Sequence, residues 1–122
     1  MSQDILSDGL NQIMNAKRSR KDKVRVVASR FFLDVLELAK REGYIASYKT
    51  EGNHVEIAFQ LHECKTIKPR FHVTVEEIEK YMRRYLPSRH LGMLVISTSK
   101  GLLTHREALD QGIGGSLIAY FF

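Results

Sequence analysis

Apolar residues at the start of the chain recur with the period of a helix, and those further along alternate as in a strand. Helical spacing predicts helices over residues 4–16 and 28–42, with a short valine-rich strand between them. Strict alternation of apolar and polar residues over 54–61, after a turn at 51–53, predicts a hairpin with one buried face. These patterns make residues 1–62 an N-terminal α-β-α-β-β lobe.

The second half of the chain is predicted to hold short helices among strands. Two capping boxes, in which a threonine hydroxyl and a glutamate carboxylate satisfy free amides, predict helices after Thr74 and after Thr104. An apolar run at 93–96 predicts a central strand, and 117–122 a final one. Residues 63–122 therefore form a β-rich C-terminal lobe. The fold class is α+β, with two tightly packed small lobes because no flexible linker separates them.

Composition favours a cytoplasmic protein with an anionic partner. The chain has 122 residues, 43% of them hydrophobic, which is enough to build a core. Lysine and arginine number 19 against 14 acids, so the formal net charge is +5 and nucleic acid or an acidic membrane face is the expected partner class. No apolar run approaches the roughly 20 residues of a membrane span, and the start lacks the order of a secretory signal. Cys64 is the only cysteine, which excludes an intrachain disulfide.

The most informative polar segment is Ser97-Thr98-Ser99-Lys100-Gly101, which puts three short hydroxyls and a lysine before a glycine. Such a row suits the phosphates and 2′-hydroxyls of folded RNA. A plain polar turn between two strands uses the same residue types. Thr104, His105 and Arg106 follow closely, and the first amides of the capped helix add partial positive charge near the same edge, which favours a phosphate-facing surface.

Two further basic segments are candidates for phosphate contact. Residues 17–25 carry at least six cations and one acid, and Arg30 follows. A charge run is usually a solvated loop, but the high density of cations in this run favours phosphate contact. Lys68 and Arg70 flank Pro69. That segment is either a backbone-contacting edge strand or an edge that proline protects from strand pairing.

The residues predict no catalytic, cofactor or metal site. His62-Glu63-Cys64 has no second pair at zinc spacing, and no acid is evidently placed to orient His105 beside the serines. The glycines at 112–115 lack the lysine of a phosphate-binding loop, so they are expected to allow a tight turn against neighbouring backbone. Tyr81 is assigned to core packing, and Tyr85 is open between packing and stacking.

The stretch from Val95 to Ala108, with Gly114-Gly115 and an apolar carboxyl end, resembles the signature of the ribosomal small-subunit protein eight family. The similarity extends along nearly the whole chain. It includes Asp8, Leu10, Ile13, Asn15 and Ala16 in the first helix, Gly43-Tyr44-Ile45, residues 67–71 and residues 86–89. The last two segments and Phe121-Phe122 resemble the archaeal and eukaryotic cytosolic branch.

The resemblance implies a two-lobed protein without enzymatic activity that is a structural constituent of the small ribosomal subunit, binds the central domain of its rRNA and supports subunit assembly. The implied partners are small-subunit rRNA and neighbouring ribosomal proteins, with no membrane and no small-molecule substrate. A free-standing RNA-binding translational regulator, and a small phosphate-handling enzyme using His105, are the alternatives. Resemblance and charge together predict these RNA-binding residues: Ser97, Thr98, Ser99, Lys100, Gly101, Thr104, His105, Arg106, Asn15, Lys17, Arg18, Arg20, Ser29, Arg30, Lys68 and Arg70.

Overall fold

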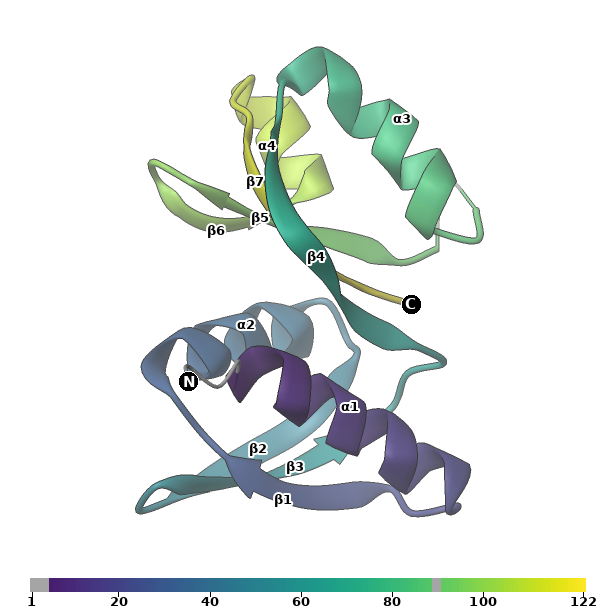
Figure 1. The fold of residues 1–122 in the computed structure, drawn as a ribbon, viewed down its shortest axis with the longest axis vertical. Coiled ribbons are helices and arrows are strands. Elements are labelled where there is room, and N and C mark those ends of the chain that lie inside the picture. The colour runs from purple at the N-terminus through teal and green to yellow at the C-terminus, as the bar shows by residue number, and fades with distance from the viewer. Residues whose placement is uncertain (1–4, 89–90) are drawn as a thin grey trace. The chain divides into compact units, whose positions relative to one another are not determined.

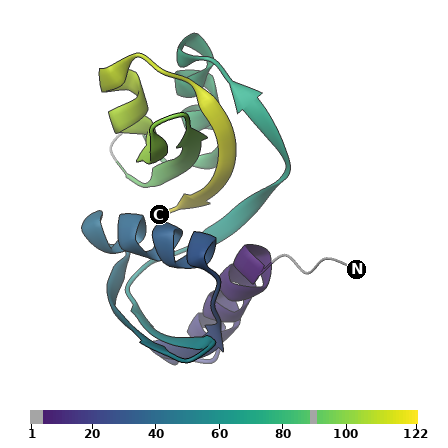
Figure 2. The ribbon, with the colours of Figure 1, turned by 90° about the vertical axis from the view of Figure 1, so that its left-hand side faces the viewer.

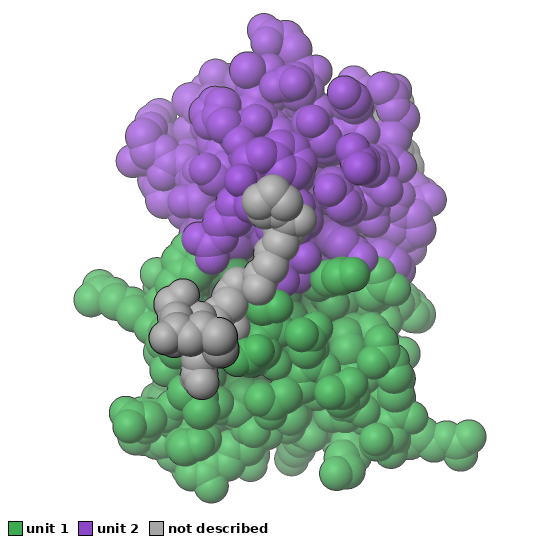
Figure 3. All heavy atoms as spheres, viewed as in Figure 1, with its two compact units in different colours: residues 1–65 green, residues 66–122 purple. Residues whose placement is uncertain are grey.

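The described part of the chain contains four helices and seven strands, arranged as two compact units. The computed structural model describes residues 5–88 and 91–122, apart from the side chains of Lys68 and Pro69. Unit 1 comprises residues 1–65 and unit 2 residues 66–122, coloured separately in Figure 3. Each unit has its own sheet with helices against it, which confirms the predicted α+β class.

Unit 1 has the predicted α-β-α-β-β order. Its sheet has the strand order β1-β3-β2, with both neighbouring pairs antiparallel. Both helices lie on one face of this sheet (Figures 1 and 2). Val55 and Ile57 on the central strand are fully buried while Glu56 between them is exposed, as the alternation predicted. The elements are α1 (Ile5–Arg18), β1 (Lys23–Val27), α2 (Arg30–Arg41), β2 (Ile45–Glu51) and β3 (His54–Phe59).

Local signals in the sequence set the ends of α2. Ser29 is its N-cap, and its hydroxyl oxygen accepts a hydrogen bond from the backbone N–H of Phe32 at 3.2 Å. The helix ends before Gly43, whose φ of 92° places it in the left-handed region that glycine adopts without strain. The helix between these signals buries Phe32, Val35 and Leu36 completely. The predicted second helix is therefore confirmed, with its ends within two residues of the expected ones.

Unit 2 is built on a four-stranded sheet with the order β4-β7-β5-β6. Helices α3 and α4, labelled in Figure 1, bury their apolar residues together with residues of three of these strands. The elements are β4 (Cys64–Val73), α3 (Val75–Tyr85), β5 (Met93–Thr98), β6 (Gly101–Thr104), α4 (His105–Gln111) and β7 (Gly115–Phe121). The core comprises Ile67, Val73, Ile78, Met82, Leu86, Leu94, Ile96, Ala108 and Leu117.

Both capping boxes that the sequence predicts are present in unit 2. The Glu77 carboxylate accepts hydrogen bonds from the backbone N–H and the hydroxyl of Thr74, at 3.0 and 3.1 Å. These bonds and the charge of Lys80 hold the pKa of Glu77 below its usual value. The local sequence therefore fixes where α3 and α4 begin.

No pattern within residues 101–104 predicts the strand β6, although a polar turn between two strands was one of the two interpretations of Ser97–Gly101. Residues 101–104 form a strand that pairs antiparallel with β5, and Ser97 and Thr98 belong to β5 itself. The expected Ser-Thr-Ser loop is consequently a tight hairpin whose turn consists of Ser99 and Lys100 alone. A four-residue strand carries too short a pattern to be recognised without its pairing partner.

Candidate nucleic-acid interface

The β5–β6 hairpin holds its turn with side-chain hydrogen bonds from within the motif. Thr98 pairs with Gly101 across the hairpin. The Thr98 hydroxyl donates to the carbonyl oxygen of Gly101 at 2.8 Å and accepts from the backbone N–H of Lys100 at 3.1 Å. Gly101 has a φ of 103°, a conformation that strains any residue with a Cβ atom. Thr98 and Gly101 thus fix the backbone conformation at Ser99 and Lys100.

The turn presents its polar groups to solvent. Ser99, Lys100 and Gly101 are exposed, and Ser97 and Thr98 are half-buried. Of the five motif residues, Ser99 and Lys100 therefore have the freest side chains, offering one hydroxyl and one ammonium group. Gly101 beside them leaves its backbone open to close approach. Such a group of donors, acceptors and positive charge can bind a phosphodiester backbone.

Thr104 and His105 do not lie at this surface, which corrects the expectation from the sequence. Their exposed fractions are 2% and 1%. The Thr104 hydroxyl accepts from the backbone N–H of Glu107 at 3.2 Å as the N-cap of α4. The His105 imidazole enters the interior from the first position of that helix. Arg106, the next residue, is exposed.

His105 is an internal support of the hairpin. Its Nδ1 accepts a hydrogen bond from the backbone N–H of Leu94 on β5 at 3.1 Å. Burial, and secondarily the charge of Arg106, lowers the pKa of His105 to about 4, so the ring is neutral near pH 7. Because Nδ1 is the acceptor, the single proton resides on Nε2, which has no hydrogen-bond partner among the described residues. The ring therefore joins α4 to β5.

The Gly114-Gly115 pair lets two backbones approach where a side chain would not fit. A Cβ atom on Gly115 would press on the carbonyl group of Ser97, and one on Gly114 would press on the carbonyl of Val73. Gly115 thereby allows β7 to lie against β5 at Ser97, two residues before the turn of the hairpin. The expectation that these glycines serve close backbone contact is confirmed.

Unit 1 has a basic hollow between the end of α1 and β1, with a volume of about 370 Å³. Asn15 and the basic run at 17–25, both predicted from the sequence to contact RNA, contribute to its lining. Its lining includes three cations, two amides and one hydroxyl, and no acidic residue. The three cations, Lys21, Lys23 and Arg25, all belong to the charge run predicted to contact phosphate, although a run alone does not show which of its cations share a concave surface. The lining residues are Gln12, Asn15, Ala16, Ser19, Lys21, Lys23, Val24 and Arg25.

The other predicted residues of unit 1 divide into two groups. Arg18 and Arg20 are exposed and Lys17 is half-buried, all at the end of α1 or just after it. Arg18 donates a hydrogen bond to the side-chain oxygen of Asn15 at 3.2 Å. Ser29 and Arg30 follow the opposite end of β1 and do not line the hollow. The Ser29 hydroxyl oxygen is used as the N-cap of α2, whereas Arg30 is exposed.

The predicted residues on β4 are described only in part. Arg70 is exposed. The side chain of Lys68 lies outside the described part of the chain, so its prediction has no structural account.

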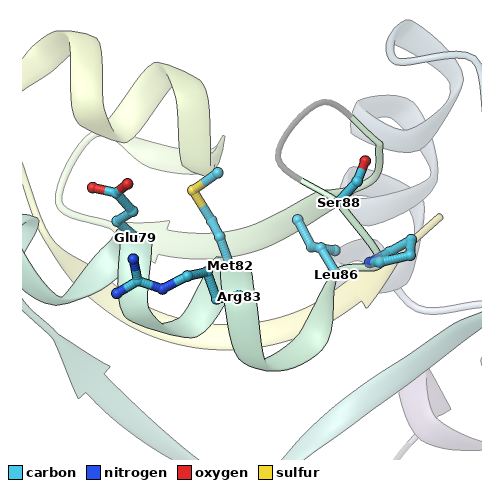
Figure 4. Close-up of a pocket in the computed structure, with 6 residues that line it drawn as sticks. Glu79, Met82, Arg83, Leu86 and Ser88 are labelled. Carbon is cyan, nitrogen blue, oxygen red and sulfur yellow. The ribbon is translucent and has the colours of Figure 1, made fainter.

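A second hollow, in unit 2, has a different character. This pocket of about 230 Å³ has Met82, Leu86 and Pro87 as its apolar walls, with Ser88 beside them (Figure 4). Glu79 and Arg83 flank it with opposite charges. The balanced charge gives this pocket no preference for a polyanion, unlike the basic hollow of unit 1.

The described residues form neither a metal-binding cluster nor a helix suited to a membrane. No three His, Cys, Asp or Glu side chains there gather closely enough to hold a metal ion. No helix among the described residues is long and apolar enough to cross a membrane.

Comparison with known proteins agrees with the resemblance seen in the sequence. Residues 4–122 match the family model described as ribosomal protein S8. Proteins named "Small ribosomal subunit protein uS8" from Nanoarchaeum equitans and Archaeoglobus fulgidus are 43% and 37% identical, with both chains covered completely. The protein of that name from Caldivirga maquilingensis is 35% identical over 98% of this chain and 97% of its own. This chain belongs to the ribosomal protein S8 family.

Proposed function

We propose that this chain is a non-enzymatic structural constituent of the small ribosomal subunit that binds the central domain of small-subunit rRNA and supports subunit assembly. Its relatives carry the name of a small-subunit protein, and they match it from end to end. The observation that carries the proposal within the molecule is the exposed Ser99-Lys100-Gly101 turn, held on a hydrogen-bonded hairpin.

The hairpin suits recognition of RNA shape rather than sequence. The Ser99 hydroxyl can donate to or accept from a ribose 2′-hydroxyl, and Lys100 can neutralise a phosphate. Gly101 lets the RNA backbone approach the protein backbone. Because the Thr98 hydroxyl and the His105 imidazole already order this segment, little conformational entropy remains to be lost on binding.

The basic hollow supplies the contact from unit 1 in this proposal. Lys21, Lys23 and Arg25 are exposed at its rim, and Asn15 and Gln12 offer amide groups between them. Three cations without an acid among the lining residues favour a phosphate backbone, with the amides positioned for sugar or base edges. Arg25 also lies 3.8 Å from Glu51 in an exposed ion pair, which a phosphate can replace at small cost.

The proposed partners and location follow from this role. They are small-subunit rRNA and the ribosomal proteins adjacent to it, on the cytoplasmic small subunit. The formal net charge of +5 favours association with a polyanion.

The test is binding of the purified chain to a transcript of the central domain of small-subunit rRNA, measured at several salt concentrations. Lys100→Ala removes one cation from the turn and is expected to lower the slope of log affinity against log salt by roughly 0.7–0.9. Ser99→Ala is expected to weaken binding by about 1 kcal/mol, roughly fivefold. Lys49→Ala is the matched control, because Lys49 is exposed on β2, the edge strand opposite β1, and lines neither surface.

Equal losses in Lys100→Ala and Lys49→Ala would show that charge alone is at work and would refute the role of the turn. Sedimentation of a cell extract addresses the place of action. Co-migration of the chain with small subunits at moderate salt supports the proposal. A chain confined to light fractions would instead indicate a free-standing RNA-binding regulator.

A further inference from the structure

Unit 2 carries a row of aromatic rings that the proposed rRNA contact does not use. The row crosses three elements: one ring lies on β4, two on α3, one on β7 and one directly after β7. Neighbouring ring centroids are 5.0, 6.5, 5.6 and 6.0 Å apart. All five side chains are half-buried, so each keeps part of its surface in contact with solvent. We call these residues the ring row: Phe71, Tyr81, Tyr85, Tyr120 and Phe122.

The rings at the Tyr81–Phe122 end of the row are nearly parallel to their neighbours. The interplanar angles are 20° between Tyr81 and Tyr85, 23° between Tyr85 and Tyr120, and 8° between Tyr120 and Phe122. Rings that only fill a core adopt edge-to-face contacts as readily as parallel ones. Four rings with similar orientation form a surface on which flat ligands that stack on one another can lie parallel to the rings.

Two cations show that ring faces on α3 are open to solvent. The ammonium of Lys80 lies 5.5 Å from the centroid of the Tyr81 ring, and the guanidinium of Arg84 lies 5.7 Å from that of Tyr85. Lys80 and Arg84 are both exposed. A solvated cation can lie over a ring only where the face is not packed against the core. The α3 rings therefore pack one side on the core and offer part of a face outward.

On α3 a cation beside an aromatic ring occurs twice, one helical turn apart. Lys80 and Arg84 are four residues apart, as are Tyr81 and Tyr85, so both pairs run along one side of the helix. The nearby acid, Glu77, is occupied by its hydrogen bonds from Thr74. Glu76, also in the first turn of α3, is exposed, whereas Arg83 and Arg84 lie in the last turn, so the Tyr85 end of this flank is cationic and favours an anionic ligand.

We propose that the ring row binds unpaired bases of single-stranded RNA. The bases stack on the rings, and Lys80 and Arg84 move from the ring faces to the flanking phosphates. Aromatic rings interleaved with cations are the means by which proteins bind single strands with little sequence preference. A folded RNA helix would instead hide its base faces. This surface is thus a site for an exposed loop or end of an RNA.

The ring row is separate from the Ser99-Lys100-Gly101 turn. The row involves β4, β7 and α3, whereas the turn lies between β5 and β6, and β4 and β6 are opposite edges of the sheet. The two contacts can therefore be lost independently, so failure of one is distinguishable from failure of the other.

The experiment measures binding of the full chain to octaadenylate RNA through quenching of tyrosine fluorescence. The chain has five tyrosines and no tryptophan, so tyrosine emission reports directly. Tyr85→Leu removes the stacking face but keeps an apolar side chain, and it is expected to weaken binding roughly tenfold or more. Arg84→Gln leaves the packing intact and is expected to weaken binding and lower its salt dependence.

Tyr48→Leu is the matched control. Tyr48 lies on β2 of unit 1 with Lys40 over its ring at 5.7 Å, so it repeats the cation–ring pair outside the ring row. Its affinity for octaadenylate should equal that of the unmodified chain. The Ser99→Ala/Lys100→Ala double variant should also retain octaadenylate binding, even where it loses the rRNA transcript.

Three outcomes would overturn the inference. The first is equal affinity of Tyr85→Leu and Arg84→Gln with the unmodified chain. The second is equal binding of octaadenylate and of an abasic ribose–phosphate strand of the same length, because stacking requires bases. The third is binding of an acidic peptide to the ring row without binding of octaadenylate, which would assign this surface to a protein partner.

Discussion

Acidification is expected to destabilise unit 2 through His105. In the folded chain the neutral ring accepts the Leu94 N–H at Nδ1, and a protonated ring has no acceptor left. The pKa is lowered from 6.5 to about 4, a difference of roughly 2.5 units that corresponds to about 3 kcal/mol. Because the folded pKa lies below the unfolded one, this stability is fully present above pH 6.5. It is lost progressively as the pH falls toward 4.

The assay compares the unmodified chain with His105→Asn, whose side-chain oxygen can still accept from Leu94. Urea unfolding followed by circular dichroism at pH 7, 6, 5 and 4.5 gives the free energy of unfolding of each. The free energy of unfolding of the unmodified chain minus that of the variant should decrease as the pH is lowered from 7 to 4.5. Effects of the carboxylates, shared by both chains, cancel in the difference. An NMR titration of the imidazole measures the pKa directly.

Two results would refute this reasoning. A His105 ring that titrates near 6.5 in the folded protein would show that burial does not disfavour its charged form. A stability difference that stays constant from pH 7 to 4.5 would show that the ring proton is not linked to folding. Either result would remove His105 as the support between α4 and β5.

Three further predictions concern the same scaffold. Gly115→Ala should destabilise the chain by about 1–3 kcal/mol in urea unfolding, because its Cβ would lie 2.9 Å from the carbonyl carbon of Ser97; an unchanged midpoint would contradict the close approach. Thr104→Ala should cost about 1 kcal/mol through the lost N-cap, whereas Thr104→Ser should restore most of it. Burial raises the pKa of Cys64 to about 12, so its thiol should resist a disulfide reagent at pH 8 until urea unfolds the chain, and prompt reaction of the folded chain would count against this burial.

Most helices and strands of this fold could be predicted from the sequence because the patterns that specify them are local. Helical spacing, alternation on β3 and the Thr104–Glu107 capping box each lie within a few residues of the structure they specify. The signature around Ser97–Gly101 was likewise enough to identify the family, since it is a contiguous motif that the family model also matches. The four residues of strand β6 did not predict a strand by themselves, because so short a segment has a recognisable pattern only when it pairs with β5.

Tertiary structure alone decided which polar residues face outward. Thr104 and His105 read as surface groups beside the motif, but the start of α4 turns both inward, where backbone amides satisfy one oxygen and one nitrogen. The basic hollow and the ring row are assembled from separate elements. Neither has a local signature, because exposure and neighbourhood depend on how distant segments pack. Sequence thus determined the elements and the family, whereas packing determined the surfaces, since the burial of a side chain is a property of the whole fold.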